Sequence, residues 1–306
     1  MISWTRSKTK VETIGLIGCG RMGVCMLEAM LKGGFKVVAY DVFPEATQRA
    51  AAMGADLTDN PKELAQVVDM VLLSLPGPLQ IRDVLFGENG VAYGLGKGKV
   101  VVDTSTVDPK TTRENAERLE EATASAYLDC PILGRPSATG KWMLPTGGSQ
   151  DALEYVKQVL LTFAANAVSV GGHGAGNALK LLNQMMFTCI NAVSSEVMAI
   201  AEYVGVDPQM FYNTVASSSA ATVSGLFREV GKCILNHDYN HPAFTVDLLI
   251  KDTKLALQMA KDSDAPSFLA GYAHMYNELA HANGHGNEDT SAVYKVFAKQ
   301  FEKEST

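Results

Sequence analysis

The apolar residues of this 306-residue chain follow two different rhythms. In the first half, short runs rich in Val, Ile and Leu alternate with stretches of helical period. The runs predict buried strands at residues 13–18, 35–41, 69–75, 99–103, 126–129, 143–147 and 167–170. The stretches predict helices at 21–32, 44–53, 61–67, 78–86, 109–122 and 150–162. This alternation indicates right-handed βαβ units on a mostly parallel, doubly wound sheet.

The second half carries only helical periods. Apolar residues at three- and four-residue steps from Leu179 to Val204 predict one helix of about 30 residues that ends at Gly205. Further helices are predicted at 208–217, 225–236, 245–261, 266–282 and 291–301. We therefore predict an α/β domain over residues 1–171 and an all-α domain over residues 172–306, with the long helix as its spine.

Composition and charge exclude several classes of protein. The chain is 47% hydrophobic and 19% charged, which is typical of a globular protein. Its net charge is −7 and its basic residues are scattered, so we expect no nucleic-acid partner. The five cysteines are widely spaced, which argues against a disulfide framework or a zinc site. Because the sequence shows neither a secretory signal nor a membrane-length apolar run, we expect a cytoplasmic protein with no membrane partner.

The glycines gather at two bends, residues 18–23 and residues 171–176, and the second directly precedes the long helix. Gly18, Gly20 and Gly23 form a Gly-x-Gly-x-x-Gly motif between the first predicted strand and the first predicted helix. Gly18 permits a tight turn, Gly20 lets the backbone approach a pyrophosphate, and Gly23 lets the helix pack on the strand. The second predicted strand ends at Asp41, whose carboxylate can bond both ribose hydroxyls and would repel a 2′-phosphate. The pattern predicts a Rossmann-type site that prefers NAD to NADP.

Further motifs extend in order over nearly the whole chain. They are Arg21 and Met22 in the glycine loop, Leu75-Pro76, Asp103-Thr-Ser105-Thr106-Val-Asp-Pro109, Gly174-x-Gly176-x-x-x-Lys180-x-x-Asn183, Phe244-x-x-Asp-Leu-x-x-Lys251-Asp252 and Gly284-x-Gly-x-x-Asp289-x-Ser291. Together they resemble the β-hydroxyacid dehydrogenase family, a group related to 6-phosphogluconate dehydrogenase that includes 3-hydroxyisobutyrate dehydrogenase and sulfolactaldehyde reductase. The resemblance implies an NAD-dependent oxidoreductase that interconverts a short 3-hydroxyacid and its semialdehyde, with the substrate in a cleft between the domains.

The resemblance also implies roles for individual residues. It marks Lys180 as catalytic, and Asn183 lies three residues later on the same helix face. We expect Lys180 to accept the alcohol proton, because burial near a positively charged nicotinamide ring would lower its pKa. Asn183 would hold the substrate oxygen. The family further implies that Ser105 and Thr106 contact substrate and nicotinamide ribose, and that the cofactor is also contacted by Arg21, Met22, Leu75, Pro76 and Lys251. The alternative for Lys180 is an ordinary solvated lysine.

One loop departs from the family. Most members carry Ser-Gly-Gly after the strand that ends in Asp-x-Pro, whereas this chain has Gly134-Arg135 there. A guanidinium binds a carboxylate, sulfonate or phosphate through paired hydrogen bonds. The Gly134-Arg135-x-Ser-Ala run is similar to that of sulfolactaldehyde reductase, but Lys141 and Trp142 are not. We predict that Gly134 and Arg135 hold a small anionic hydroxyacid or semialdehyde, and the head group stays open.

Other interpretations also remain open. A reductase of a sulfonate substrate and a non-catalytic NAD-binding sensor are the two alternatives in function. An imine reductase on the same architecture usually replaces the lysine and uses NADPH, so Lys180 and Asp41 disfavour it. The apolar second half and its long helix predict a homodimer or homotetramer. Two pairs of histidines four residues apart, at 237/241 and 281/285, are interrupted by Pro242 and Gly284, so no metal site is predicted.

Overall fold

The computed structural model of the protein describes residues 4–6, 8–218 and 224–298. The chain divides into two compact units, Met1–Lys180 and Leu181–Thr306. This division falls inside one long helix, whereas the sequence places the domain boundary just before that helix. The opening turns of the helix therefore belong to the first unit and the remainder to the second.

The first unit is built on an eight-stranded sheet with the strand order β3-β2-β1-β4-β5-β6-β7-β8. The neighbouring strands are parallel except for β6 and β7, which are antiparallel. The strands are β1 (Thr13–Ile17), β2 (Lys36–Tyr40), β3 (Asp56–Leu57), β4 (Met70–Leu73), β5 (Val100–Asp103), β6 (Ala126–Asp129), β7 (Trp142–Gly148) and β8 (Ala164–Gly171). Parallel strands need crossover connections, which place helices on both faces of the sheet.

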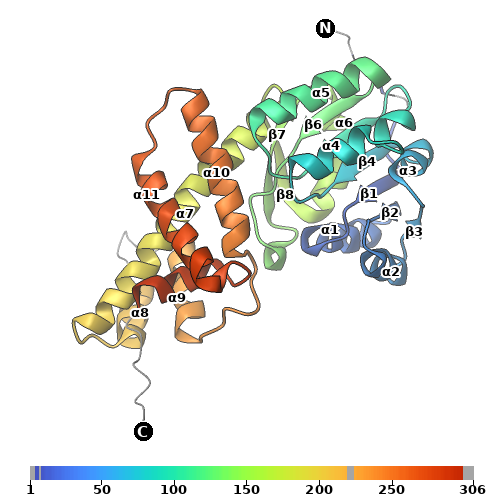
Figure 1. The fold of residues 1–306 in the computed structure, drawn as a ribbon. Coiled ribbons are helices and arrows are strands. Elements are labelled where there is room, and N and C mark those ends of the chain that lie inside the picture. Colours follow the sequence, from blue (N-terminus) through green and yellow to red (C-terminus); the bar gives the residue numbers. More distant parts are fainter. Residues whose placement is uncertain (1–3, 7, 219–223, 299–306) are drawn as a thin grey trace. The chain divides into compact units, whose positions relative to one another are not determined.

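Helices cover the sheet in two sets. They are α1 (Arg21–Lys32), α2 (Pro44–Ala52), α3 (Pro61–Val67), α4 (Pro78–Phe86), η1 (Val91–Tyr93), α5 (Pro109–Thr123), η2 (Pro136–Ala138) and α6 (Gln150–Phe163). Leu16 packs in a core with α1, α2 and α6, whereas the next residue, Ile17, packs in a second core with α3, α4 and α5. Successive strand side chains point to opposite faces, so the strands supply both cores. In Figure 1, α4 and α5 lie above the strands, and α1 and α2 lie below them.

The helices of this unit begin in two ways. Some have a side-chain cap: Asn60 accepts a hydrogen bond from the Glu63 amide at 2.9 Å, and Asp108 accepts one from the Thr111 amide at 2.8 Å. Helices α1 and α4 instead begin after a glycine and have no side-chain cap. Helix α2 also lacks a side-chain cap, but it begins after Phe43, so α1 and α4 are distinguished by the glycine that precedes each of them.

The second unit is helical, as the second half of the sequence predicts. Its elements are the remainder of α7 (Ala175–Tyr203), then α8 (Pro208–Ser217), α9 (Gly225–Leu235), α10 (Val246–Asp262), α11 (Phe268–Ala280), η3 (His281–His285), η4 (Thr290–Val293) and α12 (Tyr294–Phe297). Buried amides tie α7 to its neighbours: Asn191 donates to the Thr290 carbonyl at 2.9 Å, and Asn277 donates to the Thr188 hydroxyl at 2.7 Å. Gly205 follows α7 with a φ of +81°, which fits the predicted helix end.

Several short elements differ from the sequence prediction, since η1, η2 and η3 were not predicted, and nor were β3 and the form of the last helix. Strand β3 was not predicted because it has only two residues, both exposed, and thus no apolar run. The helix predicted over 291–301 is instead the short η4 followed by α12, and its last residues lie outside the described part of the chain. Asp289 accounts for the early turn, since its carboxylate accepts hydrogen bonds from the amide and hydroxyl of Ser291. Within the described residues, no helix combines the length and hydropathy needed to cross a membrane.

Candidate active site

The first glycine bend has the geometry that its sequence predicts. Gly18 has a φ of +97°, and a Cβ atom on it would overlap the carbonyl oxygen of Ser74. A Cβ atom on Gly23 would overlap the carbonyl oxygen of Gly18. At Gly20, by contrast, no described neighbour lies within 4 Å of such an atom. The backbone of the bend is therefore in close contact with other protein atoms at Gly18 and Gly23. At Gly20, where a pyrophosphate is expected, there is open space.

Helix α1 starts directly after Gly20. The first N–H groups of a helix have no partner within the helix and carry the positive end of its dipole. In α1 no side chain caps these groups. Arg21 is exposed at this end, and Met22 packs partly buried against the core. An uncapped helix N-terminus beside an open glycine is an anion site of the type that binds phosphate.

Asp41 follows β2 and reaches the same bend. Its Oδ2 atom accepts a hydrogen bond from the Cys19 amide at 2.7 Å, and its Oδ1 atom accepts one from the Phe43 amide at 2.9 Å. The side chain is half-buried, and each carboxylate oxygen can accept a further hydrogen bond. The bend thus fits both parts of a dinucleotide: the helix amides and Gly20 fit its phosphates, and Asp41 fits a ribose.

Two of the predicted cofactor motifs meet at the carboxyl ends of β4 and β5. The Leu75 amide donates to the Ser105 hydroxyl at 2.9 Å, which joins Leu75-Pro76 to the segment that carries Thr106. Ser105 is 4% exposed, whereas Thr106 is partly exposed. Neighbouring parallel strands end at one edge of the sheet, so this placement follows from the strand order.

Asp103 supports that segment from below. It is completely buried, and its Oδ1 and Oδ2 atoms accept hydrogen bonds from the Ser105 amide at 2.9 Å and the Tyr127 hydroxyl at 2.6 Å. Burial raises the pKa of Asp103 to about 6, although both hydrogen bonds oppose the shift. A carboxylate that can lose its charge near neutral pH therefore lies under the Ser105 segment.

Trp142 anchors the loop that departs from the family pattern. Its indole N–H donates to the Arg135 carbonyl at 2.7 Å, and a Cβ atom on Gly134 would overlap its ring. Arg135 is partly buried, and η2, which follows it, contacts α1. The two departures noted in the sequence, Arg135 and Trp142, are thus parts of one structure, in which the indole fixes the backbone that presents the arginine.

A buried carboxylate holds the second glycine bend, from which α7 starts. The Oδ1 atom of Asp129 accepts a hydrogen bond from the Gly174 amide at 2.8 Å, and its Oδ2 atom accepts one from the Asn177 amide at 2.9 Å. Asp129 is 0% exposed, and burial raises its pKa, while these two N–H groups oppose the shift. Lys180 follows Asn177 by three residues, so the helix turn that carries it has a fixed origin.

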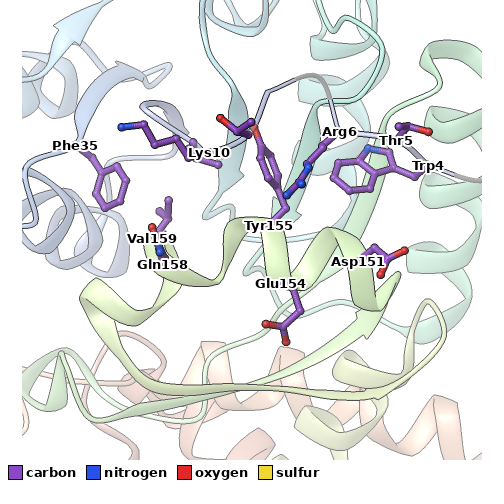
Figure 2. A pocket seen from close by; sticks show the side chains of 12 residues that line it. Trp4, Thr5, Arg6, Lys10, Phe35, Asp151, Glu154, Tyr155, Gln158 and Val159 are labelled. Atoms are coloured by element: carbon purple, nitrogen blue, oxygen red, sulfur yellow. The ribbon is translucent and has the colours of Figure 1, made fainter.

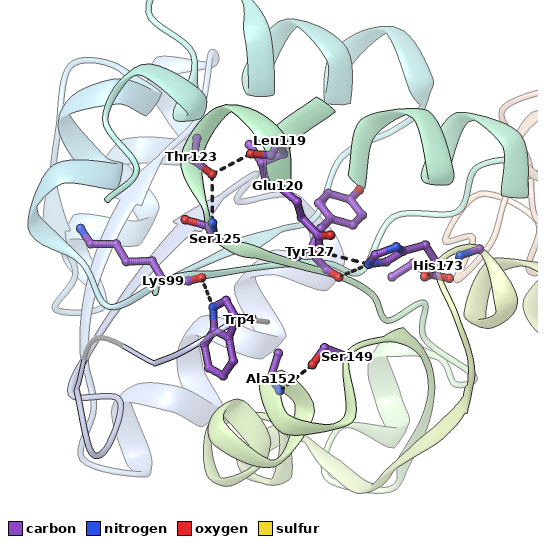
Figure 3. A network of polar contacts seen from close by, with 12 residues as sticks. Trp4, Lys99, Leu119, Glu120, Thr123, Ser125, Tyr127, Ser149, Ala152 and His173 are labelled. Atoms are coloured by element: carbon purple, nitrogen blue, oxygen red, sulfur yellow. Dashed lines mark hydrogen bonds and ion pairs between the residues drawn. The ribbon is translucent and has the colours of Figure 1, made fainter. Parts of the chain in front are cut away.

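The residue directly before Gly174, His173, is held by its side chain. Its Nε2 atom lies 3.0 Å from the Tyr127 carbonyl oxygen and 3.2 Å from Glu120 Oε1, as Figure 3 shows. The same Glu120 oxygen accepts a hydrogen bond from the Tyr127 amide at 3.0 Å. The bond to Glu120 is the main reason that the pKa of His173 is raised. The bend is thus joined to β6 on both sides of Gly174.

Asp129 and Asn177 were not among the residues that the sequence singled out. A charged residue at the end of a buried strand, and an asparagine inside the Gly-x-Gly to Lys180 motif, were the available signals. Each also fits an ordinary strand end or helix surface. Only their burial and their hydrogen bonds identify them as the residues that fix the start of α7.

The predicted residues of the second unit lie near a buried amide. Asn183 is exposed, and its amide donates to the Gln184 side-chain oxygen at 3.3 Å. Gln184 is 3% exposed and donates to Asp252 at 2.7 Å, and Lys251 pairs with Asp252 at 2.8 Å. Gln184 was not singled out in the sequence, although it shares a helix face with Lys180 by its four-residue spacing.

A cavity of about 500 Å³ lies at a different part of the first unit (Figure 2). Residues of the N-terminal segment line it, among them Trp4 and Lys10, together with Phe35 and with Tyr155 on α6. Phe35 directly precedes β2, so the cavity lies at the amino ends of the strands, opposite the edge where the predicted site residues gather. None of those residues lines this cavity, which is therefore separate from the predicted cofactor site.

His281 and His285 each pair with an acid. His281 Nδ1 lies 2.6 Å from Asp247, and His285 Nδ1 lies 3.2 Å from Glu288. Between the two histidines, Gly284 leaves the helical conformation with a φ of +89°. Across the described residues there is no group of three or more His, Cys, Asp or Glu side chains that could hold a metal ion.

Two family models match consecutive parts of the chain. The model described as the NAD binding domain of 6-phosphogluconate dehydrogenase matches residues 13–172. The model described as the NAD-binding domain of NADP-dependent 3-hydroxyisobutyrate dehydrogenase matches residues 174–297. The first match spans the sheet and both strand-edge motifs, and the second begins at the bend before α7.

Individual proteins are similar along almost the whole chain. An L-threonate dehydrogenase from Cupriavidus necator is 35% identical over 94% of this chain and 96% of its own. A 3-sulfolactaldehyde reductase from Escherichia coli is 32% identical over 92% of this chain and 95% of its own. The crystal structure of a 3-hydroxyisobutyrate dehydrogenase from Salmonella typhimurium superposes with a TM-score of 0.85 at 30% identity, over 94% of this chain and 100% of that one. The chain thus belongs to the β-hydroxyacid dehydrogenase family, as an NAD(P)-dependent dehydrogenase.

Proposed function

We propose that this protein interconverts a short 3-hydroxyacid and its semialdehyde, with NAD as the hydride carrier. One observation carries the proposal. The helix that bears Lys180 is anchored by Asp129 within the same compact unit as the open bend at Gly20. Hydride and proton must leave the same alcohol group, so the reaction needs the dinucleotide and a proton acceptor to be held in a defined geometry around one substrate.

The residues divide the chemistry among them. When bound, the nicotinamide ring accepts the hydride during oxidation and supplies it during reduction. Lys180 as the neutral amine takes the proton from the substrate hydroxyl, and as the ammonium it returns a proton to the carbonyl oxygen. One proton and one hydride thus leave the alcohol in each oxidation. Ser105, Thr106 and Asn183 are the proposed partners of the substrate, and Lys251 is a proposed partner of the cofactor.

Asp41 supports NAD over NADP as the preferred cofactor. Its carboxylate is held at the glycine bend by the Cys19 amide, where it would bind ribose hydroxyls and repel a 2′-phosphate. The residues after it, Val42 and Phe43, are exposed and apolar, so neither supplies a cation for a phosphate. This preference refines the family assignment, which covers both cofactors.

Arg135 supports an anionic head group on the substrate. Its backbone is fixed by Trp142, and its guanidinium suits a carboxylate, sulfonate or phosphate through paired hydrogen bonds. The relatives point to two head groups: the Cupriavidus necator enzyme is named for a carboxylate, L-threonate, and the Escherichia coli enzyme for a sulfonate. We propose a carboxylate substrate, with a sulfonate as the alternative.

A substrate panel tests the proposal. NADH formation is measured with 3-hydroxyisobutyrate, L-threonate, 2,3-dihydroxypropanesulfonate and a phosphorylated hydroxyacid, for the wild type and for Arg135→Ala. We expect turnover of one carboxylate substrate, and a loss in kcat/KM of ~10- to 100-fold in the variant, since a hydrogen bond to a charged group contributes about 1.5–3 kcal/mol. The matched control is Arg228→Ala, an exposed arginine on α9, which should retain the wild-type kcat/KM.

The outcomes separate the alternatives. Turnover of the sulfonate alone would show that the substrate is a sulfonate and not a carboxylate. An equal loss for all head groups, or no loss, would remove Arg135 as the selecting residue. NAD binding without turnover of any substrate, in either direction and with either cofactor, would favour a non-catalytic NAD sensor.

We also propose that the protein is a cytoplasmic homo-oligomer. The second unit exposes large apolar side chains on one side of α11, namely Phe268, Tyr272 and Met275, which are 78%, 67% and 63% exposed. Exposed apolar patches of this kind mark protein interfaces. Light scattering should give a dimer or tetramer for the wild type and a smaller species for Tyr272→Glu, and a monomeric wild type would contradict the proposal. The five cysteines are all free, which suits a reducing compartment.

A further inference from the structure

Asn177 lies in the first turn of α7, three residues before Lys180, and its side chain is 0% exposed. Its Oδ1 atom accepts a hydrogen bond from the Val107 amide at 3.2 Å, and its Nδ2 atom donates to the Thr112 hydroxyl at 3.1 Å. Val107 directly follows Thr106, and Thr112 lies in the first turn of α5. One buried amide thus connects the start of α7 to the segment that carries Thr106.

The backbone of Asn177 is held as well. Its N–H group donates to Asp129 Oδ2 at 2.9 Å, while the other oxygen of Asp129 binds the Gly174 amide. The first turn of α7 is therefore attached to β6 through its backbone and to the Thr106 segment through a side chain. All of these contacts lie within the first unit, which also contains Lys180.

From these contacts we propose that Asn177 is a positioning residue, which sets Lys180 relative to Thr106. The proposal rests on the proposed function, in which Lys180 and Thr106 both contact the substrate. Residues three apart share a helix face, so Asn177 and Lys180 move together when the first turn of α7 rotates or shifts. A proton acceptor must lie about 2.6–3.2 Å from the oxygen that it serves, and a misplacement of ~1 Å can lower the rate ~100-fold.

The amide side chain suits this role for a physical reason. The Val107 N–H group needs a hydrogen-bond acceptor, and the Thr112 hydroxyl can accept a hydrogen bond. Among side chains of this length, only asparagine supplies an acceptor and a donor without a charge. Removal of the amide would leave the buried Val107 N–H group unpaired. The first turn of α7 would keep its backbone bonds to Asp129 but lose its side-chain attachment to the Thr106 segment.

The test compares two buried asparagines on the same helix. Asn177→Ala removes the connection to the Thr106 segment. Asn191→Ala is the matched control, because Asn191 is also 0% exposed on α7 but bonds to the Thr290 carbonyl instead. For each variant we measure kcat per NADH-binding site, the pH dependence of kcat, the Kd for NADH by fluorescence, and amide exchange of peptides that cover residues 104–108. The substrate is the member of the panel above that the wild type oxidises.

We expect Asn177→Ala to lower kcat ~10- to 100-fold, to shift the acidic midpoint of the kcat–pH profile, and to speed amide exchange at 104–108, with the Kd for NADH unchanged within about twofold. Asn191→Ala should lower thermal stability and keep the wild-type kcat and pH profile. If Asn177→Ala does not fold, Thr112→Val removes one of the two side-chain bonds and should lower kcat by a smaller factor.

Wild-type values of kcat and of the pH midpoint in Asn177→Ala and Thr112→Val would overturn the positioning role. The failure of the proposed function has a different signature. It would appear as an unchanged kcat in Lys180→Ala, or as no turnover in the wild type, while amide exchange would still report whether Asn177 fixes the Thr106 segment.

Discussion

The two glycine-rich bends of the first unit share a plan and differ in what surrounds them. Each places a glycine of positive φ two residues before a second glycine: Gly18 at +97° precedes Gly20, and Gly174 at +87° precedes Gly176. A Cβ atom on Gly20 would have no described neighbour within 4 Å, whereas one on Gly176 would lie 2.6 Å from the carbonyl oxygens of Asp129 and Pro145. The first bend is open and the second is filled by the protein itself.

The acids at the two bends differ in the same way. Asp41 is half-buried, and each of its oxygens accepts one hydrogen bond from a backbone amide. Asp129 is 0% exposed and accepts hydrogen bonds from the start of α7. A helix N-terminus that is left uncapped is available to an external anion, and one that a buried carboxylate occupies is an anchor. The same local motif is thus open to an external anion at α1, where we propose that the cofactor binds, and is filled at α7, where it fixes the start of the helix that carries Lys180.

One of the two largest expected effects on stability comes from a methyl group at the filled bend. Gly176→Ala would place its Cβ against two backbone oxygens that cannot move independently of β6 and β7. We expect a loss of about 2–3 kcal/mol in the free energy of unfolding, as for overpacking in a core. Urea denaturation followed by circular dichroism measures it.

The matched variant at the open bend is Gly20→Ala. It should change the free energy of unfolding by less than ~1 kcal/mol, since Gly20 precedes α1 where the Cβ has space. Its Kd for NADH should rise at least ~10-fold, because the methyl group takes the space that a pyrophosphate needs. Equal losses of stability in the two variants would break the distinction between an open and a filled bend.

A second effect is the pH dependence of the folding stability, which arises from Asp103 beneath the Thr106 segment. Because the pKa of Asp103 is raised to about 6, the folded state favours its protonated form. The resulting stabilisation is complete below the unfolded pKa of about 3.9, and it is lost as the pH rises through about 6, with a total of about 3 kcal/mol. Asp103→Asn should therefore flatten the fall in melting temperature between about pH 4 and pH 7. An unchanged dependence of melting temperature on pH in Asp103→Asn would contradict the raised pKa of Asp103.

The smallest expected effect is a change of cofactor preference at the open bend. Asp41→Ser removes the carboxylate that would repel a 2′-phosphate, so the ratio of kcat/KM for NADP to that for NAD should rise at least ~10-fold, or about 1.4 kcal/mol. Asp59→Ser, at an exposed position outside the bend, is the control and should keep the wild-type ratio. No change in Asp41→Ser would show that Asp41 does not face the ribose.

Much of this comparison could be predicted from the sequence, and its limits have physical causes. The glycine spacing predicted the first bend, since these glycines act through local backbone geometry, and the place of Asp41 at the end of the second predicted strand put it at the same sheet edge. Asp129 and Asn177 act through contacts with residues distant in the chain, such as Val107, and periodicity carries no information about such contacts. Trp142 likewise looked like a departure in the substrate loop until its hydrogen bond to the Arg135 carbonyl showed that it is the anchor.

The fold shows the same limits. Strands and helices with strong apolar periods were predicted to within a few residues of their ends, because burial on one or two faces determines their pattern. The two-residue β3 and the early turn at Asp289 before η4 and α12 depend on a few hydrogen bonds, which leave no apolar pattern in the sequence. The burial of Gln184 and its hydrogen bond to Asp252 likewise could not be predicted from helical spacing.

The most direct test of the central claim is the turnover of Lys180→Ala with the best substrate of the panel, measured together with the Kd for NADH. In our account Lys180 transfers the proton, and a separate glycine bend binds the dinucleotide. In Lys180→Ala, kcat should therefore fall ~10²- to 10⁴-fold while the Kd stays within about twofold of the wild type. A kcat near that of the wild type, with NADH bound normally, would contradict the account.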